Sequence, residues 1–433
     1  MVVLLTGASG FIGRHLAQAL VAARHQVVCA VRKPPGPPGK NEGKEAYAPC
    51  LRFVTADFTR DFDAADWIPR LTGIDVVINA VGIIREQGAQ TFEAIHEKAP
   101  RALFAACAQG GVKLVIQLSA LGADEQAQSR YHLSKKRADD YLRSLPVHSV
   151  IVQPSLVYGA GGTSARLFTT LASLPLIGLP GQGRQQIQPV HIDDVVATMI
   201  SLLGNPPPSG TRIAVVGPQS MSLREFLGDL RQAMSMGNAH FLPVPAALVR
   251  AGAAAAPFLP GSLLDQETLQ MLERGNTADA APVSMLLGRA PRAAGDFIGK
   301  TEARTVRIQA QLNWLLPLLR WSIALVWIVT GIVSLGLYPV EDSYALLARV
   351  GITGMLAPLM LYGAAVLDLA FGIGILVLRK RRLLWLAQAA LILFYTAIIS
   401  WRLPEFWLHP YGPLLKNLPM LAAIWMLLEL EDR

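Results

Sequence analysis

The fold is decided at the start of the chain, where the apolar run Val2–Leu5 leads directly into Thr6-Gly-Ala-Ser-Gly-Phe-Ile-Gly13. Residues Phe11–Ala23 then carry the apolar spacing of a helix. Glycine lets the backbone turn tightly and approach a ligand closely, and the N–H groups at a helix N-terminus bind phosphate. In this strand–turn–helix context, the glycine motif predicts a site for the pyrophosphate of a nucleotide. A tight turn without a ligand is the alternative.

The same alternation of short apolar runs and helical segments continues to about residue 200. The runs are Val2–Leu5, Gln26–Val31, Leu51–Val54, Asp75–Ala80, Lys113–Leu118 and Ser149–Val152. Such alternation favours a parallel sheet covered by helices on both faces. We therefore expect an α/β doubly wound Rossmann domain over residues 1–300, within which the irregular part, roughly 160–300, forms a substrate or lid subdomain. Lys33–Pro49, rich in Pro, Gly and Lys, is predicted to be a mobile surface loop.

The second predicted strand ends at a basic residue. Arg32 stands where an acid would bind the ribose 2′-hydroxyl of NAD(H), and it is followed by another cation, Lys33. An arginine in this position accommodates a 2′-phosphate. The sequence therefore favours NADP(H) over NAD(H).

A second motif, Tyr131-His-Leu-Ser-Lys135, lies after the fifth predicted strand. On a helix, residues four apart share one face, so the ammonium of Lys135 can approach the phenol of Tyr131. A nearby cation lowers the pKa of a phenol, and such a tyrosine can exchange a proton with a substrate oxygen. Ser119, at the end of that strand, could hold the same oxygen. A solvated surface helix is the alternative.

The glycine spacing and the Ser119, Tyr131, Lys135 set resemble the extended and atypical short-chain dehydrogenases. Leu118–Ala123, Gln153–Gly159, Pro180–Gly183 and Gln188–Asp194 are similar to the group related to the dehydrogenase-like accessory subunit of respiratory complex I, although Gln153 replaces an Arg of that group. The resemblance covers about residues 1–300. Together with the motifs above, it implies that the cofactor is bound by Gly7, Ser9, Gly10, Phe11, Ile12, Gly13, Arg32, Asp57, Phe58, Ala80, Val81, Gly82, Tyr131, Lys135 and Pro154.

Three further polar residues, His191, Asp193 and Asp194, could suggest a metal site. We instead expect an Asp to cap a helix that begins near Val195, and we expect no metal. The three cysteines have neither a metal nor a disulfide spacing, and Cys29 and Cys107, which lie in apolar runs, are expected to be buried reduced thiols.

After residue 313 the chain becomes strongly apolar. About 20 apolar residues span a bilayer as a helix, and four segments approach that length, with one internal Lys416 expected to snorkel. We expect a transmembrane four-helix bundle over 314–433, with spans at about 319–340, 354–378, 383–401 and 413–430. Asp368 in Leu367–Gly374 and the segment Pro413–Pro419 resemble the DoxX-like family.

Asp368 is costly to bury inside a membrane, so it should face the bundle interior or a functional path. A protonated Asp hydrogen-bonded to a neighbouring helix is an equal alternative. Gly372 and Gly374 are expected to permit close helix contact.

Charge predicts the orientation in the membrane. Arg379-Lys-Arg-Arg382 is the densest basic cluster, and the positive-inside rule places it in the cytoplasm. The nucleotide domain lies two crossings before this cluster in the chain, so it is expected on the same, cytoplasmic side, as are both termini. We expect no signal peptide before Val2, which agrees with this orientation. We expect a multi-pass protein of the inner membrane. Its net charge of +8 suits an anionic leaflet rather than nucleic acid.

These features predict a membrane-anchored NAD(P)H-dependent oxidoreductase that transfers hydride to or from a carbonyl or alcohol, with Tyr131 as acid/base. Its substrate could be lipophilic, quinone- or isoprenoid-like, and its other partners would be the bilayer and membrane proteins. Two alternatives stay open. One is a nucleotide-sugar type epimerase or dehydratase with tightly bound cofactor, and the other is a non-catalytic NADPH-binding assembly or sensor subunit of a respiratory complex.

Overall fold

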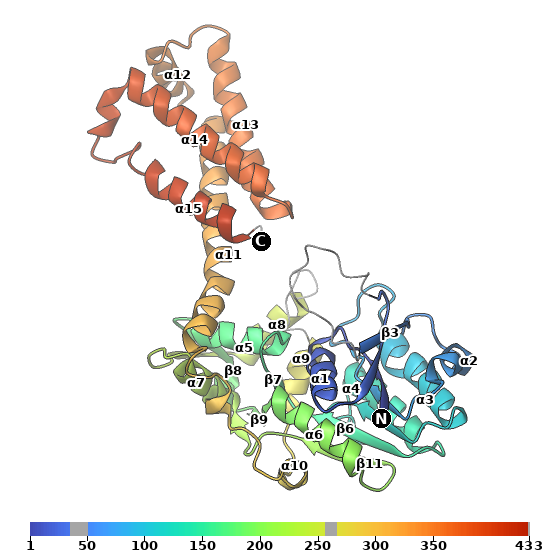
Figure 1. Ribbon diagram of the computed structural model, residues 1–433. Helices are drawn as coiled ribbons and strands as arrows, with labels where there is room; N and C mark the ends of the chain where they lie inside the picture. The colour runs from blue at the N-terminus through green and yellow to red at the C-terminus, as the bar shows by residue number, and fades with distance from the viewer. Residues whose placement is uncertain (35–50, 256–265, 432–433) are drawn as a thin grey trace. The chain divides into compact units, whose positions relative to one another are not determined.

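A seven-stranded parallel sheet forms the centre of the N-terminal unit in the computed structural model, which describes residues 1–34, 51–255 and 266–431 (Figure 1). Chain contacts divide the protein into two units, Met1–Ala310 and Gln311–Arg433. Most of the predicted loop Lys33–Pro49 lies outside the described residues. The strands are β1 (Val2–Thr6), β2 (Gln26–Val31), β3 (Leu51–Thr55), β4 (Val76–Asn79), β5 (Leu114–Leu118), β6 (Ser149–Pro154) and β11 (Thr211–Val215).

The strand order β11-β6-β5-β4-β1-β2-β3 confirms the predicted doubly wound fold. The chain moves from β1 outward to β3, then crosses to the other side of β1 and continues through β4, β5 and β6. Ligands of such sheets bind outside the carboxyl ends of the strands, where the strand order reverses. In this chain that point lies between β1 and β4.

Helices cover both faces of the sheet, because its central strands are apolar on both sides. The helices α1 (Phe11–Ala22) and α6 (Ile192–Gly204) contribute Leu16, Leu20 and Met199 to one buried cluster. On the opposite face, α3 (Ala99–Gln109) and α4 (Arg130–Arg143) contribute Phe104 and Leu142 to a second. Burial on both faces explains why the strands read as continuous apolar runs.

The structure departs from the expected elements in two places. The segment Phe92–Ala108 has the apolar spacing of an α-helix, but it begins as a π-helix, η2 (Glu93–Lys98), before it continues as α3. Strand β11 was not foreseen, because it follows the Pro-rich turn in a stretch read as irregular. It pairs in parallel with β6 through all five of its residues, so it belongs to the sheet.

The substrate subdomain has a small core of its own, in which Tyr158, Phe226 and Phe297 pack together. Its helices are α5 (Thr163–Ser173), α7 (Leu223–Ala233), α8 (Ala246–Ala255) and α9 (Gln266–Arg274). Its short strands are β7 (Val157–Tyr158), β8 (Ile177–Pro180), β9 (Gln186–Ile187), β10 (Val190–His191), β12 (Met221–Ser222) and β13 (Phe241–Val244). Two further short helices, α2 (Ala64–Trp67) and α10 (Ala281–Leu287), pack beside the sheet.

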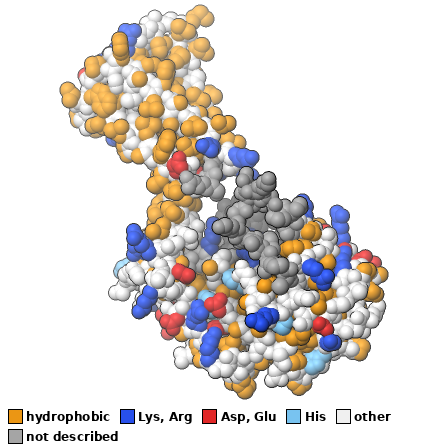
Figure 2. Space-filling view, viewed as in Figure 1, with side chains coloured by type: hydrophobic (Ala, Val, Ile, Leu, Met, Phe, Trp, Pro, Cys, Tyr) orange, Lys and Arg blue, Asp and Glu red, His pale blue; other side chains and the backbone are white. Residues whose placement is uncertain are grey.

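The C-terminal unit is all helical. It contains α11 (Ala303–Ile332), which begins in the first unit, followed by η6 (Val333–Leu337), α12 (Val340–Arg349), α13 (Leu356–Val377), α14 (Arg382–Arg402), η7 (Pro404–Trp407) and α15 (Asn417–Glu431). Among the described residues, three helical segments are long and apolar enough to cross a membrane: Ala303–Leu337, Leu356–Val377 and Arg382–Arg402. Figure 2 shows hydrophobic side chains over much of the visible surface of this unit.

The fourth expected span, 413–430, is shorter than predicted. Residues 413–416 form turns, and the helix α15 begins at Asn417 and has 15 residues. At about 1.5 Å per residue, such a helix measures about 22 Å, less than the roughly 30 Å of a bilayer core. The first three spans therefore meet the length criterion and α15 does not.

Small residues bring α11 and α13 close together, as expected for Gly372. A Cβ atom at Gly372 would lie 2.5 Å from Ile328 Cγ1, and one at Gly331 would lie 2.8 Å from the carbonyl oxygen of Ala365. Gly374 is less tightly enclosed, since its Cβ would lie 3.3 Å from Leu384 of α14. Asp368 lies on this part of α13, beside Thr330 of α11.

Candidate functional site

The glycine loop between β1 and α1 forms a cradle in which side chains would not fit. Gly7 has a φ of 71°, and a Cβ on it would lie 2.7 Å from the backbone of Ala80 at the end of β4. A Cβ on Gly13 would lie 2.0 Å from the carbonyl oxygen of Gly7. Among the described residues, no side chain caps the N-terminus of α1 at Gly10. The loop and the free N–H groups therefore fit a pyrophosphate.

Buried polar side chains link the carboxyl ends of the three central strands next to this loop. Thr6 Oγ1 donates to Asn79 Oδ1 at 2.5 Å, and Asn79 Nδ2 donates to Gln117 Oε1 at 2.7 Å. All three are almost completely buried. Because buried polar groups need partners, this chain fixes the relative positions of β1, β4 and β5. The sequence motifs include Thr6 but do not reveal Gln117 as part of this chain of hydrogen bonds.

The two residues expected near the adenosine end lie within electrostatic range of each other. Arg32 is exposed at the end of β2, and Asp57 follows β3. Partial burial would raise the pKa of Asp57, but hydrogen bonds from Thr59 and the charges of Arg32 and Arg60 hold it below its usual value. Phe58 is buried behind them and packs against Trp67. The site thus combines a fixed carboxylate with an exposed guanidinium.

Tyr131 and Lys135 lie one turn apart at the start of α4, which Ser129 caps through a 3.2 Å hydrogen bond from the His132 N–H. Lys135 is buried, and its Nζ donates to the carbonyl oxygens of Leu118 at 3.1 Å and Val81 at 3.3 Å. Lys135 therefore joins α4 to the ends of β4 and β5. It also lies directly over Gly82, where a Cβ would be 3.1 Å from Nζ.

The pKa of Tyr131 moves in the opposite direction from the one the sequence predicts. Burial raises it to about 12, and the negative charge of Asp139 adds to this effect. The cation expected to lower it, Lys135, is turned towards two backbone carbonyls. At neutral pH, Tyr131 is thus a phenol, which is the form that donates a proton.

Ser119, the third predicted catalytic residue, has a different partner from the one expected. It directly follows β5, and its hydroxyl donates to the buried carboxylate of Asp139, one turn beyond Lys135 on α4. Sequence reasoning missed Asp139, although its spacing of four residues from Lys135 and eight from Tyr131 was a signal that all three share a helix face.

His96, in the π-helix η2, is a second residue that the motifs did not reveal. Its Nε2 accepts the N–H of Ile83 at 3.0 Å, so Nδ1 carries the proton and donates to Ser134 Oγ at 2.9 Å. Ser134 in turn donates to the carbonyl oxygen of Tyr131 at 2.7 Å. Burial and the nearby Lys135 lower the pKa of His96 well below its usual value. A neutral histidine therefore links the segment after β4 to α4.

The first turn of α4 and the segment after β5 both contact α9. Glu267 Oε2 accepts the backbone N–H of Tyr131 at 3.3 Å. Arg274 donates to both carboxylate oxygens of Asp124, at 2.6 and 2.7 Å. Pro154, expected at the cofactor, ends β6, and its carbonyl oxygen accepts the N–H of Leu121 at 3.0 Å. The Pro154 backbone thus supports the loop that follows Ser119.

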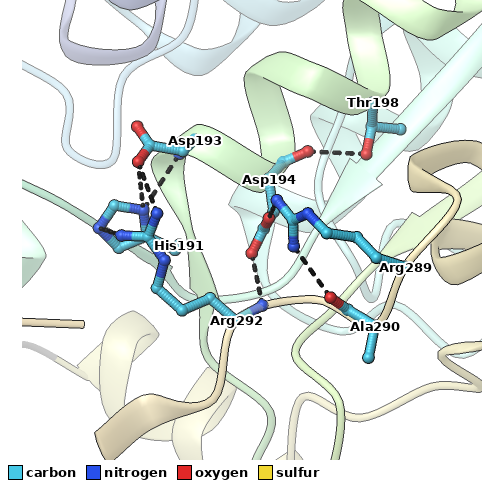
Figure 3. A network of polar contacts seen from close by, with 7 residues as sticks. All are labelled: His191, Asp193, Asp194, Thr198, Arg289, Ala290 and Arg292. Carbon is cyan, nitrogen blue, oxygen red and sulfur yellow. Dashed lines mark hydrogen bonds and ion pairs between the residues drawn. The ribbon is translucent and has the colours of Figure 1, made fainter. Parts of the chain in front are cut away.

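The residues His191, Asp193 and Asp194 form a network that differs from the predicted one (Figure 3). The helix α6 begins at Ile192, earlier than expected, and His191 caps it by accepting the N–H of Asp193 at 3.2 Å. The expectation of an Asp cap near Val195 is therefore wrong. Asp194 is fully buried and accepts from Arg289 at 2.5 Å and from the N–H of Arg292 at 2.7 Å. Its role is to attach the segment after α10 to α6.

Fold and site together define a nucleotide-binding domain of the short-chain dehydrogenase type joined to an apolar helical domain. Comparison with known families agrees with both parts. Residues 3–217 match the NAD dependent epimerase/dehydratase family, and residues 324–425 match the DoxX-like family.

Two groups of relatives are similar to the N-terminal part. A ceramide reductase of Caulobacter vibrioides is 28% identical over 206 residues, which are 47% of this chain and 62% of that protein. The mitochondrial NADH dehydrogenase [ubiquinone] 1 alpha subcomplex subunit 9 of Arabidopsis thaliana is 27% identical over 261 residues, 58% of this chain and 62% of that one. The chain thus spans 62% of the length of each relative.

Solved structures share the fold. A nucleoside-diphosphate-sugar epimerase of Staphylococcus aureus matches 69% of this chain and 99% of its own, with a TM-score of 0.55 and 18% identity. A UDP-glucuronic acid 4-epimerase of Bacillus cereus, solved with NAD, matches 72% of this chain and 100% of its own, with a TM-score of 0.52 and 19% identity. At these identities the likeness concerns the fold alone.

Proposed function

We propose that this protein is a membrane-bound reductase that converts a lipid carbonyl to an alcohol with NADPH. The observation that carries the proposal is the arrangement on α4. The Tyr131 phenol and the Lys135 amine lie at the carboxyl edge of the sheet, and Lys135 reaches the ends of both β4 and β5. This edge also holds the glycine cradle, so a nucleotide bound there would extend towards Tyr131.

The protonation state of Tyr131 favours the direction of reduction. When bound, the cofactor supplies a hydride to the carbonyl carbon. Tyr131, held as a phenol by its raised pKa, donates its proton to the carbonyl oxygen, and solvent returns the proton afterwards. Oxidation of an alcohol would need the phenolate, which burial disfavours. Lys135 supports the ribose and keeps a positive charge near the developing oxyanion.

A lipid substrate is supported by two observations of different kinds. Three apolar helices long enough to span a bilayer follow the nucleotide domain, and a relative that is 28% identical is a ceramide reductase. A substrate that stays in the membrane would explain why the two domains are joined. We place the protein in the inner membrane, with the basic cluster Arg379–Arg382 and the nucleotide domain on the cytoplasmic side.

The cofactor preference rests on Arg32. Its exposed guanidinium lies at the end of β2 beside Asp57 and can pair with a 2′-phosphate. NADPH is therefore the proposed reductant.

A second candidate function is that of a non-catalytic nucleotide-binding subunit. It is favoured by the similarity to the NADH dehydrogenase subunit 9 relatives. It is also favoured by the hydrogen bond that the Ser119 hydroxyl donates to Asp139, because that proton is then not available to a substrate. An epimerase or dehydratase remains the third alternative, in view of the family of residues 3–217.

The test is turnover by the full chain in lipid nanodiscs. Long-chain keto lipids and quinones are supplied with NADPH, and the loss of NADPH absorbance is followed together with product mass. A reductase consumes one NADPH for each alcohol formed, whereas an isomerised product without net NADPH loss would indicate the epimerase. Tight nucleotide binding without any product from either substrate class would favour the non-catalytic subunit.

A further inference from the structure

The contact between Ser119 and Asp139 lies in the protein interior, where 4% of Ser119 and 0% of Asp139 are exposed. Ser119 follows β5, and Asp139 is on α4, two turns beyond Tyr131 and one beyond Lys135. The hydroxyl of Ser119 donates to Asp139 Oδ2. The contact therefore joins the strand end that supports the site to the helix that carries it.

A serine hydroxyl has one proton to donate, and here it is given to a carboxylate. Hydrogen bonds to a charged acceptor are about twice as strong as those between neutral groups. A neutral substrate carbonyl would therefore compete poorly for this proton. If Ser119 turned away, Asp139 would lose the hydrogen bond in a buried environment, which is costly.

Asp139 is also placed to act on Tyr131 and Lys135 by charge. Its Oδ1 is buried and has no hydrogen-bond partner within the described part of the chain. The charged groups that act on Asp139 are Lys135 on the same helix, Arg212 on β11 and the neighbouring Asp140. Facing Lys135 from η2 is His96, which is neutral because burial and the charge of Lys135 lower its pKa. Asp139 is thus the negative group closest along α4 to the buried ammonium of Lys135.

Lys135 needs a compensating charge. A buried ammonium loses hydration, and the two carbonyl oxygens of Leu118 and Val81 restore only part of it. Burial lowers the pKa of Lys135, while Asp139 acts in the opposite direction. Burial likewise raises the pKa of Asp139, to about 7, although the hydrogen bond from Ser119 and the charge of Lys135 oppose that rise, so Asp139 carries its negative charge above neutral pH.

We propose that Asp139 is the positioning residue of this site and that Ser119 serves Asp139 rather than the substrate oxygen. Above neutral pH, Ser119 favours the ionised form of the Asp139 carboxylate, and that charge helps to keep Lys135 protonated. The part of this inference that concerns the reaction rests on the proposed reductase function, whereas the part that concerns Lys135 does not.

The experiment measures NADPH binding to the full chain in detergent, by nucleotide fluorescence, between pH 6 and pH 10. In the wild type, affinity should fall as Lys135 loses its proton. Asp139→Asn keeps the shape and an acceptor for Ser119 but removes the charge. Because the charge of Asp139 raises the pKa of Lys135, its removal should move the loss of NADPH affinity to lower pH. A shift of about one pH unit corresponds to a tenfold lower ratio of protonated to neutral Lys135 at a given pH.

Three further variants separate charge from structure. Glu125→Gln is the matched control, since Glu125 is an exposed acid that pairs with Lys136 of α4, and it should leave the profile unchanged. Ser119→Ala should move the profile in the same direction as Asp139→Asn, because Asp139 loses the bond that favours its ionised form. Ser119→Thr, which retains the hydroxyl, should restore the wild-type profile.

An Asp139→Asn profile that coincides with that of the wild type would overturn the proposal. So would a Ser119→Ala protein that reduces substrate about 100-fold more slowly at every pH with an unshifted profile, which is the behaviour of a serine that contacts the substrate. If Asp139→Asn fails to fold, Ser119→Ala tests the same linkage. If the wild type shows no turnover but Asp139→Asn still shifts the binding profile, the proposed reductase function is contradicted and the role of Asp139 is supported.

Discussion

The Nζ atom of Lys135 lies 3.1 Å from the carbonyl oxygen of Leu118, the last residue of β5. This contact ties α4 to the carboxyl edge of the sheet. It places a cation where the nucleotide is expected. Several consequences for activity and stability follow from this arrangement.

Tyr131→Phe should abolish most reduction and preserve nucleotide binding. The ring still packs against His96 and Phe92, but no proton donor remains. Loss of general acid catalysis costs about 10²–10⁴-fold in rate. Single-turnover NADPH oxidation and nucleotide fluorescence measure the two effects separately. Unchanged turnover would show that Tyr131 is structural.

Ionisation of Tyr131 should not lower the rate of reduction until the pH is strongly alkaline. An acid catalyst must be protonated, and the pKa of Tyr131 is raised to about 12, so its proton is retained well above neutrality. Any loss of rate below pH 10 then reports another group, and Lys135 is the expected one. The dependence of kcat on pH at saturating NADPH checks this. In Tyr131→Phe no phenol remains, so any pH dependence of the residual rate must come from another group.

Arg32→Ala should remove the preference for NADPH. The guanidinium is exposed at the end of β2, so the substitution alters no packing and leaves NADH binding nearly unchanged. Titration of both nucleotides gives the ratio of their Kd values. Lys33→Ala is the matched control, with a smaller expected effect. Equal affinities in the wild type would refute the assignment of the 2′-phosphate site.

Asp194→Asn should destabilise the N-terminal unit without affecting the nucleotide site. Asp194 is fully buried and accepts from Arg289 and from the Arg292 N–H. Hydrogen bonds that involve a charged group contribute about 1.5–3 kcal/mol each, so the melting temperature should fall by several degrees. The control is Asp193→Asn, because that side chain is 55% exposed. A melting temperature equal in both variants would contradict the role of Asp194.

Reporter fusions test the topology. If the three long spans cross the membrane and the nucleotide domain is cytoplasmic, a fusion at Glu341 should read as external and one at Arg381 as internal. A fusion at Glu405 should again be external, and one after Glu431 decides whether the 15-residue α15 completes a fourth crossing. An external signal at Arg381 would reverse the orientation.

Local patterns in the sequence were sufficient for much of this protein. The glycine loop, the first six strands and the long apolar helices could be predicted. Each of them depends on residues that are neighbours in the sequence: the strands and helices on their periodicity, the loop on its glycines and the spans on a continuous apolar run. Strand β11 was not predicted, because it forms by pairing with β6. The length of α15 was not predicted either, because it depends on where the turns at 413–416 end.

The sequence by itself determined which residues reach the carboxyl edge of the sheet, while the tertiary structure decided what each of them does there. Ser119 and Asp139 are 20 residues apart, and no periodicity predicts that a serine will donate to a carboxylate across a strand and a helix. The protonated nitrogen of His96 follows from an N–H on another segment. The raised pKa of Tyr131 is a consequence of desolvation, which depends on every segment packed around the phenol and therefore exists only in the folded chain.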